Sequence, residues 1–178
     1  MPKKGILILG GARSGKSSFA QQMAGKLGQR VLFVATGEPL DDEMQARISE
    51  HKKSRPREWR TIETPRNVTE QIKKHVFDAD VVLIDCLTLL VSNLLSTDSD
   101  YVKTEGEVLI QIENLVTLLK QLNLSWVIVS NEVGMGIVPE TRLGRVYRDI
   151  LGKVNQLVAI QATEVYFMIS GIPVKIKG

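Results

Sequence analysis

The stretch Gly10-Gly11-Ala12-Arg13-Ser14-Gly15-Lys16-Ser17 decides the fold of this 178-residue chain. It fits the pattern G-x-x-x-x-G-K-S, follows a short apolar run at residues 6–9 and leads into a helix-like stretch. In such a setting the backbone N–H groups point at phosphate oxygens, and the helix N-terminus adds positive potential. The alternative is a chance glycine-rich turn, and the flanking strand and helix argue against it. The sequence therefore predicts a site for the triphosphate of ATP or GTP, with Lys16 between the β- and γ-phosphates and Ser17 on Mg²⁺.

Apolar runs of strand length alternate with amphipathic stretches along the rest of the chain. The expected strands are residues 6–9, 31–35, 61–63, 81–85, 126–129, 165–169 and 174–176, and the expected helices are 16–27, 41–53, 68–75, 87–95, 102–122 and 141–161. This alternation predicts an α/β fold of the P-loop, RecA-like kind: a mostly parallel sheet with helices on both faces. The last two strands should be antiparallel around a Gly-Ile-Pro turn at 171–173. We find no linker or repeat, so residues 1–178 should form a single nucleotide-binding domain.

Asp85 ends the strong strand signal Val81-Val82-Leu83-Ile84. In P-loop proteins an acidic residue at this place sits beside the loop and orients Mg²⁺ and its waters. The alternative is an aspartate that caps the following helix. We favour the metal role because the phosphate loop is already present.

Composition narrows the class of function. A net charge of +3 suits an anionic ligand but is too mild to argue for nucleic acid. A RecA-like nucleic-acid motor is a competing interpretation, which the scattered arginines and few aromatics disfavour. The single cysteine, Cys86, cannot form an internal disulfide, so we expect a cytoplasmic protein. The apolar run behind the basic start is too short for a signal peptide, and no stretch approaches the roughly 20 apolar residues of a membrane span.

A basic segment contains a histidine with two open interpretations. On a helix, Arg47, His51 and Arg55 would stack at i, i+4 and i+8 as a cationic ridge. Neutral imidazole is a good nucleophile toward phosphorus, and neighbouring cations would lower its pKa and neutralise the phosphates it attacks. However, Met44, Ile48 and His51 fall at i, i+4 and i+7, which also fits a histidine packed beside an apolar stripe. The residues alone leave both open.

Beyond the phosphate loop, the chain carries an ordered set of short motifs: Ala35-Thr36, Asp41-Asp42-Glu43-Met44, Arg47-Ile48 with His51 and Arg55-Pro56, Trp59 with Thr61 and Glu63, Asp85-Cys86-Leu87-Thr88, Asn93-Leu94-Leu95, the stretch from Asn131 to Pro139, Arg148-Asp149, Gly152 to Asn155-Gln156, and Ser170-Gly171-Ile172-Pro173 with Lys175. In this set the chain resembles the bifunctional adenosylcobinamide kinase / adenosylcobinamide-phosphate guanylyltransferase family, from about Ile6 to Gly178. It departs from the family at Leu87-Thr88-Leu89-Leu90, where members often carry an aromatic, and residues 96–100 lie in a region of variable length.

The resemblance implies two steps of cobalamin nucleotide-loop assembly. The first phosphorylates the aminopropanol hydroxyl of adenosylcobinamide with ATP or GTP. In the second, His51 attacks the α-phosphate of GTP and releases pyrophosphate, and the guanylyl group passes to adenosylcobinamide phosphate to give adenosylcobinamide-GDP. A plain small-molecule kinase without guanylylation is the closest rival.

The resemblance also assigns site residues. It makes Gly10–Ser17 the triphosphate site, with Lys16 and His51 catalytic. Further guanine-nucleotide and metal contacts fall on Thr36, Lys52, Lys53, Ser54, Arg55, Glu63 and Asp85. A corrinoid substrate and a homotrimer are implied as partners. We expect the corrinoid near the loop 131–139, where ligands of open α/β sheets gather, with Glu132 as a candidate for the kinase step.

Overall fold

The computed structural model describes residues 2–39, 41–53, 55–95 and 100–178, except for the side chains of Glu43, Met44 and Arg47. Seven strands alternate with six helices in the described residues, in the order β1 (Gly5–Gly10), α1 (Lys16–Leu27), β2 (Val31–Ala35), α2 (Asp42–Lys53), β3 (Arg60–Glu63), α3 (Val68–His75), β4 (Val81–Asp85), α4 (Leu87–Leu94), α5 (Tyr101–Gln121), β5 (Ser125–Val129), α6 (Arg142–Gln161), β6 (Glu164–Ile169) and β7 (Ile172–Lys177). None of these helices is long and apolar enough to cross a membrane.

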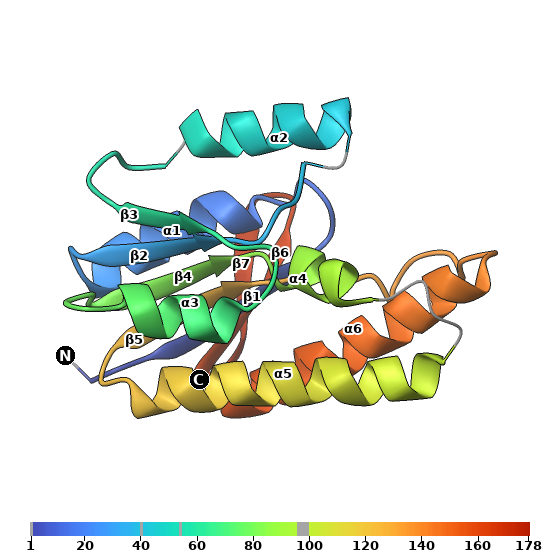
Figure 1. Ribbon diagram of the computed structural model, residues 1–178. Coiled ribbons are helices and arrows are strands. Elements are labelled where there is room, and N and C mark those ends of the chain that lie inside the picture. Colours follow the sequence, from blue (N-terminus) through green and yellow to red (C-terminus); the bar gives the residue numbers. More distant parts are fainter. Residues whose placement is uncertain (1, 40, 54, 96–99) are drawn as a thin grey trace.

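The seven strands form one sheet in the order β3-β2-β4-β5-β1-β6-β7. All neighbours are parallel except β6 and β7. Strand β5 lies between β1 and β4, with Val129 opposite Ile8 on one side and Asp85 on the other. The carboxyl ends of these three strands therefore meet at one edge of the sheet, from which the loops after them emerge (Figure 1).

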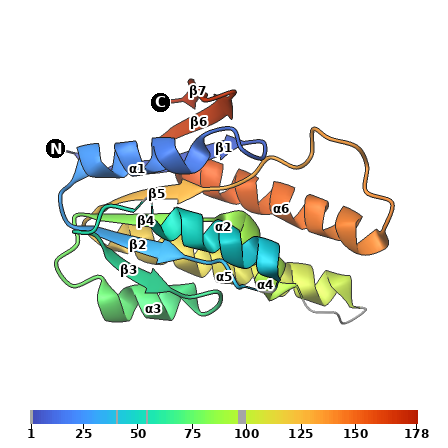
Figure 2. The ribbon, with the colours of Figure 1, turned by 90° about the horizontal axis from the view of Figure 1, so that it is seen from above.

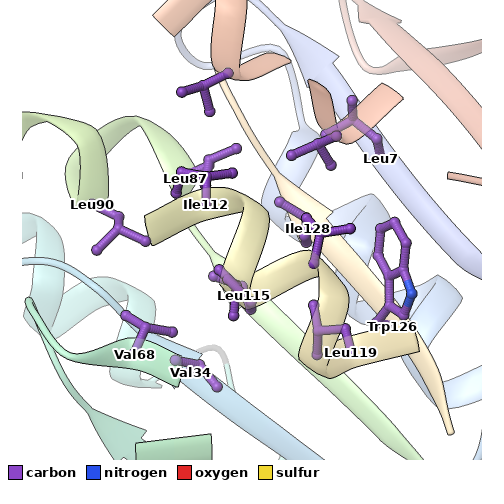
Figure 3. Packing of buried hydrophobic residues seen from close by; sticks show 14 of the residues in the cluster. Leu7, Val34, Val68, Leu87, Leu90, Ile112, Leu115, Leu119, Trp126 and Ile128 are labelled. Carbon is purple, nitrogen blue, oxygen red and sulfur yellow. The ribbon is translucent and has the colours of Figure 1, made fainter. Parts of the chain in front are cut away.

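Helices cover both faces of the sheet, as the strands' apolar character predicted (Figures 1 and 2). On one face α3, α4, α5 and α6 pack against the strands, and Leu115 and Leu119 of α5 are buried near Trp126 and Ile128 of β5 (Figure 3). On the other face Ala20 and Ala24 of α1 pack against β1, β2 and β4. Helix α2 lies on this second side, away from the sheet (Figure 1). The expected fold class is confirmed.

The element boundaries agree with the sequence prediction within one or two residues, and the last hairpin is the one correction. Its turn is Ser170-Gly171, both with positive φ, 50° and 83°. Ile172 and Pro173 already belong to β7, and Pro173 pairs with Met168. An edge strand tolerates proline because one row of its backbone groups faces no partner. In the expected loop 96–100, only Asp100 is described, and its side chain caps α5 by accepting from Lys103 N at 3.1 Å.

Candidate active site

The phosphate loop makes a tight turn that needs glycine at two positions. Gly10 and Gly15 have φ of 148° and 91°, values that side-chain-bearing residues rarely adopt. A Cβ on Gly10 would also lie 2.7 Å from the Met168 carbonyl oxygen. Gly11, Ala12 and Arg13 are exposed on the outer turn. The loop is tied to the β6–β7 turn, because Gly171 N donates to the Ser14 carbonyl at 3.0 Å.

Lys16 lies inside this loop and is only 8% exposed. Its ammonium donates to the Gly11 carbonyl oxygen and lies 3.5 Å from Ser14 Oγ. Burial lowers the pKa of Lys16, and the Coulombic influence of Cys86 and Asp85 acts in the opposite direction. A buried ammonium held by loop oxygens is placed to exchange them for phosphate oxygens.

Ser17 and Asp85 form the oxygen-rich corner of the site. The Ser17 hydroxyl donates to the Asp85 carboxylate, whose side chain is 11% exposed. Burial raises the pKa of Asp85, against the hydrogen bond from Ser17 and the charges of His51, Arg55 and Lys16. The described part of the chain has no cluster of three or more His, Cys, Asp or Glu suited to a metal. One carboxylate and one hydroxyl still fit Mg²⁺, which keeps several waters and takes most other ligands from a nucleotide.

The end of α2 brings His51 to this corner. His51 Nδ1 lies 3.9 Å from Asp85 Oδ2, and the histidine side chain is 48% exposed. His51 is therefore not packed in the core, and the apolar-stripe interpretation is wrong. Ile48, one turn before it, lies against Gly37, where an added Cβ would approach Ile48 Cδ1 to 3.2 Å. This contact with the loop after β2 sets how closely α2 approaches the sheet.

The cationic ridge expected on one helix is also wrong. Helix α2 ends at Lys53, so Arg55 lies beyond it. The residue before a proline is disfavoured in helical geometry, and Pro56 follows Arg55. The side chain of Arg47 and the whole of Ser54 lie outside the described residues, so their expected roles stay predictions.

Arg55 turns back onto the sheet instead. Its guanidinium lies 4.3 Å from the ring centroid of Phe33 in β2, and Arg55 Nη1 lies 3.9 Å from Glu63 Oε1. The side chain is 9% exposed, and its Nε is buried with no hydrogen-bond partner among the residues described. Burial lowers the pKa of Arg55, and the charges of Glu63 and Asp85 oppose that shift. A buried guanidinium with an unused donor is well suited to an anionic ligand.

Glu63 and Lys52 complete the same side of the site. Lys52 Nζ lies 2.7 Å from Glu63 Oε1, and both side chains are about half exposed, at 48% and 51%. Lys53 is exposed and has no hydrogen bond or ion pair to another described residue. The structure therefore gathers Lys52, Arg55 and Glu63, and it shows no such contact for Lys53.

Thr36 is fully buried below the site. Its hydroxyl donates to the Cys86 carbonyl at 2.6 Å and accepts from Cys86 N at 2.9 Å. The side chain expected to contact nucleotide is thus engaged with the segment that follows Asp85. It fixes the backbone after β4 relative to β2.

Asn93 is a site residue whose role sequence reasoning missed. Its Nδ2 donates to the Thr36 carbonyl at 2.8 Å and to the Pro65 carbonyl at 3.0 Å, which ties the loop after β2 to the loop after β3. The available signal was an amide on a helix, Leu87–Leu94, in which five of the eight residues are leucine or valine. The sequence did not say which loops it would join.

Comparison with solved structures supports the fold. The crystal structure of the RadB recombinase superposes with a TM-score of 0.52 at 14% identity, over 93% of this chain and 74% of that one. At this identity the likeness concerns architecture alone.

Comparison with curated sequences is more specific. The chain is 45% identical to the bifunctional adenosylcobalamin biosynthesis protein CobU of Escherichia coli and to that of Salmonella typhimurium, in each case over 97% of this chain and 99% of the relative. It is 40% identical to the CobP protein of Pseudomonas aeruginosa, over 97% of this chain and 96% of that protein. The family model described as cobinamide kinase / cobinamide phosphate guanyltransferase matches residues 6–176. The chain therefore belongs to the cobinamide kinase / cobinamide phosphate guanyltransferase family.

Proposed function

We propose that this enzyme phosphorylates the hydroxyl of adenosylcobinamide with ATP or GTP, and then transfers GMP from GTP to that product through a guanylyl group on His51. The observation that carries the proposal is that a phosphate loop and a histidine lie together at one edge of the sheet. One is the phosphate loop with its buried Lys16, and the other is His51, 3.9 Å from the Asp85 carboxylate that also accepts from Ser17.

In both steps the loop residues Gly10–Ser17 hold the triphosphate. Backbone N–H groups and Lys16 bind its oxygens, while Ser17 and Asp85 hold Mg²⁺, which supplies positive charge against the phosphates. In the second step Arg55 and Lys52 add cations on the α2 side, and Glu63, 2.7 Å from Lys52, offers a carboxylate to the base of the nucleotide. We assign Thr36 a positioning role, because its hydroxyl is engaged with Cys86.

In the second step an imidazole nitrogen of His51 attacks the α-phosphorus of GTP. The bond from this phosphorus to the β-phosphate oxygen breaks, and pyrophosphate leaves. A phosphate oxygen of adenosylcobinamide phosphate then attacks the same phosphorus, the P–N bond breaks and the histidine is restored. Asp85 lies nearest Nδ1, and a carboxylate there favours the tautomer whose lone pair is on Nε2.

The experiment that tests this proposal incubates the protein with GTP that is radioactive at the α-phosphate. Wild-type protein should retain label after denaturation through an acid-labile, base-stable bond. His51→Ala should lose the label and keep phosphorylation of cobinamide, whereas His75→Ala, on α3, should behave as wild type. Label that persists in His51→Ala would exclude this acceptor. Wild-type protein that phosphorylates cobinamide without taking up label would favour the plain kinase.

Three further parts of the proposal rest on family resemblance and composition. These are Mg²⁺ as the metal, a homotrimer as the assembly and the cytoplasm as the location, the last supported by the single free cysteine. Light scattering coupled to size-exclusion chromatography would measure the assembly. A mass equal to one chain would contradict the trimer.

A further inference from the structure

Glu132 has no role in the proposed transfer of GMP through His51. It lies three residues beyond the end of β5, the strand between β1 and β4. Glu132 N donates to the Gly10 carbonyl at 3.2 Å, so this residue is in direct contact with the first residue of the phosphate loop. The strand order thus places the backbone of Glu132 beside the loop, on the side of β1 where β5 and then β4, the strand that ends at Asp85, follow.

The start of this loop is held firmly. Asn131 N donates to Thr88 Oγ1 at 2.7 Å, and the Asn131 carbonyl accepts from Asn155 Nδ2 at 3.0 Å. Asn155 in turn accepts from the buried Ser130 hydroxyl at 2.7 Å. The residues before Glu132 are therefore fixed to α4 and α6, which fixes where its side chain begins.

The other carboxylates at this edge are engaged or more distant. Asp85 accepts from Ser17, and Glu63 lies 2.7 Å from Lys52 Nζ. Glu38 follows β2, which β4 and β5 separate from β1. The Glu132 carboxylate accepts a hydrogen bond from Gly134 N at 2.7 Å and is not paired with any cation in the described chain. Of these four acidic residues, Glu132 is the one whose backbone contacts the phosphate loop, and its carboxylate has no cation partner among the described residues.

We propose that Glu132 is the general base of the kinase step, an inference that rests on the proposed function. The substrate hydroxyl oxygen bonds to the γ-phosphorus as the bond from this phosphorus to the β-phosphate oxygen breaks. The hydroxyl proton passes to Glu132, and the nucleoside diphosphate leaves with the electron pair. Glu132 then releases the proton to water. Transfer of GMP through His51 has no such hydroxyl and does not need Glu132.

The bifunctional enzyme allows a direct test with Glu132→Gln. Glutamine keeps an oxygen that can accept from Gly134 N, so the loop is held, but it cannot take the proton. Single-turnover phosphorylation of cobinamide by ATP should fall by about 10²–10⁴-fold, the usual contribution of a general base. Self-labelling with α-labelled GTP should stay within about twofold of wild type. Glu140→Gln, an exposed change in the same loop, should keep both activities.

Two results would overturn the inference. One is phosphorylation by Glu132→Gln within about threefold of wild type. The other is an equal loss of phosphorylation and self-labelling, which would mean that the residue maintains the shape of the phosphate loop. Glu132→Asp, which retains a carboxylate at shorter reach, should recover part of the phosphorylation lost in Glu132→Gln. Failure of wild-type protein to phosphorylate cobinamide at all would instead overturn the proposed function.

Discussion

The phosphate loop and helix α2 bring residues to the same site by opposite means. The loop is built into the sheet: Lys16 is 8% exposed, and Gly10 has no room for a side chain. None of the α2 side chains that the structure describes is buried. The α2 segment reaches the site through a few contacts, such as Ile48 with Gly37 and Lys52 with Glu63. Substitutions in the buried phosphate loop and in the exposed helix α2, which carries His51, should therefore have different effects on the two steps.

The largest effect should come from a substitution in the phosphate loop itself. Lys16→Ala removes the buried cation that both steps need, so phosphorylation and self-labelling should each fall by about 10²–10³-fold, as when a main charge-stabilising donor is lost. Lys26→Ala, at the other end of α1, serves as the control. Steady-state rates with ATP and α-labelled GTP measure the two steps. A Lys16→Ala protein with either rate intact would contradict the loop assignment.

The next substitution tests the α2 side alone. Arg55→Ala should lower self-labelling about tenfold to a hundredfold, equivalent to the roughly 1.5–3 kcal/mol of a hydrogen bond to a charged group. Phosphorylation should change less than threefold, because Arg55 lies against Phe33 rather than in the loop. Arg55→Lys should restore little, since lysine lacks the planar fork and stacking surface. The control is Arg57→Ala, at an exposed residue nearby. Equal losses of phosphorylation and self-labelling in Arg55→Ala would mean that the α2 segment and the phosphate loop do not contribute separately to the two steps.

Asn93 tests how the two regions are joined. Asn93→Ala leaves the Thr36 and Pro65 carbonyls without their shared donor, which should cost about 1–3 kcal/mol of unfolding free energy. We expect self-labelling to fall more than phosphorylation, because the loops it ties flank Glu63 and the start of α2. Chemical denaturation and both rates should be compared with Ser92→Ala, exposed on the same helix. An unchanged unfolding free energy would show that this tie contributes nothing.

The smallest effect on catalysis should come from the far end of the sheet. Lys4 Nζ lies 2.6 Å from Glu164 Oε1, and Tyr166 donates to Glu164 Oε2 at 2.7 Å. The Lys4 and Tyr166 hydrogen bonds lower the pKa of Glu164 from 4.5 to about 2. The stability from this lowered pKa is complete above pH 4.5 and is lost as the pH falls toward about 2.

Glu164→Gln should therefore melt at a lower temperature than wild type at pH 7, and the gap should narrow as the pH falls from 4.5 toward about 2. Both catalytic rates at neutral pH should be unchanged. Thermal melts across this range measure the gap. A gap that stays constant or widens on acidification would mean that the ionised carboxylate is not the source of the stability.

The sequence predicted what depends on neighbouring residues along the chain. The phosphate loop, the strand ending at Asp85 and the helix that carries His51 all follow from local pattern. The end of α2 at Lys53 was also predicted correctly, but the stacking of Arg55 with His51 on one helix was wrong, because Pro56 keeps Arg55 out of helical geometry. The tie made by Asn93 and the contact of Glu132 with Gly10 depend on strand order, which no local pattern gives. The sequence analysis named Glu132 as a candidate, and the position of β5 between β1 and β4 explains why its backbone contacts the phosphate loop.

A single loop of this kind in the sequence has a consequence for timing. Under the proposed function, one nucleotide site must present the γ-phosphorus to the substrate hydroxyl in the kinase step. The same site must present the α-phosphorus to His51 in the guanylylation step. ATP for the first step and GTP for the second would therefore compete for this site, and each chain would catalyse the two steps at different times. A non-hydrolysable ATP analogue should then compete with GTP for self-guanylylation, and the cellular ratio of the two nucleotides would set how often each chain changes task.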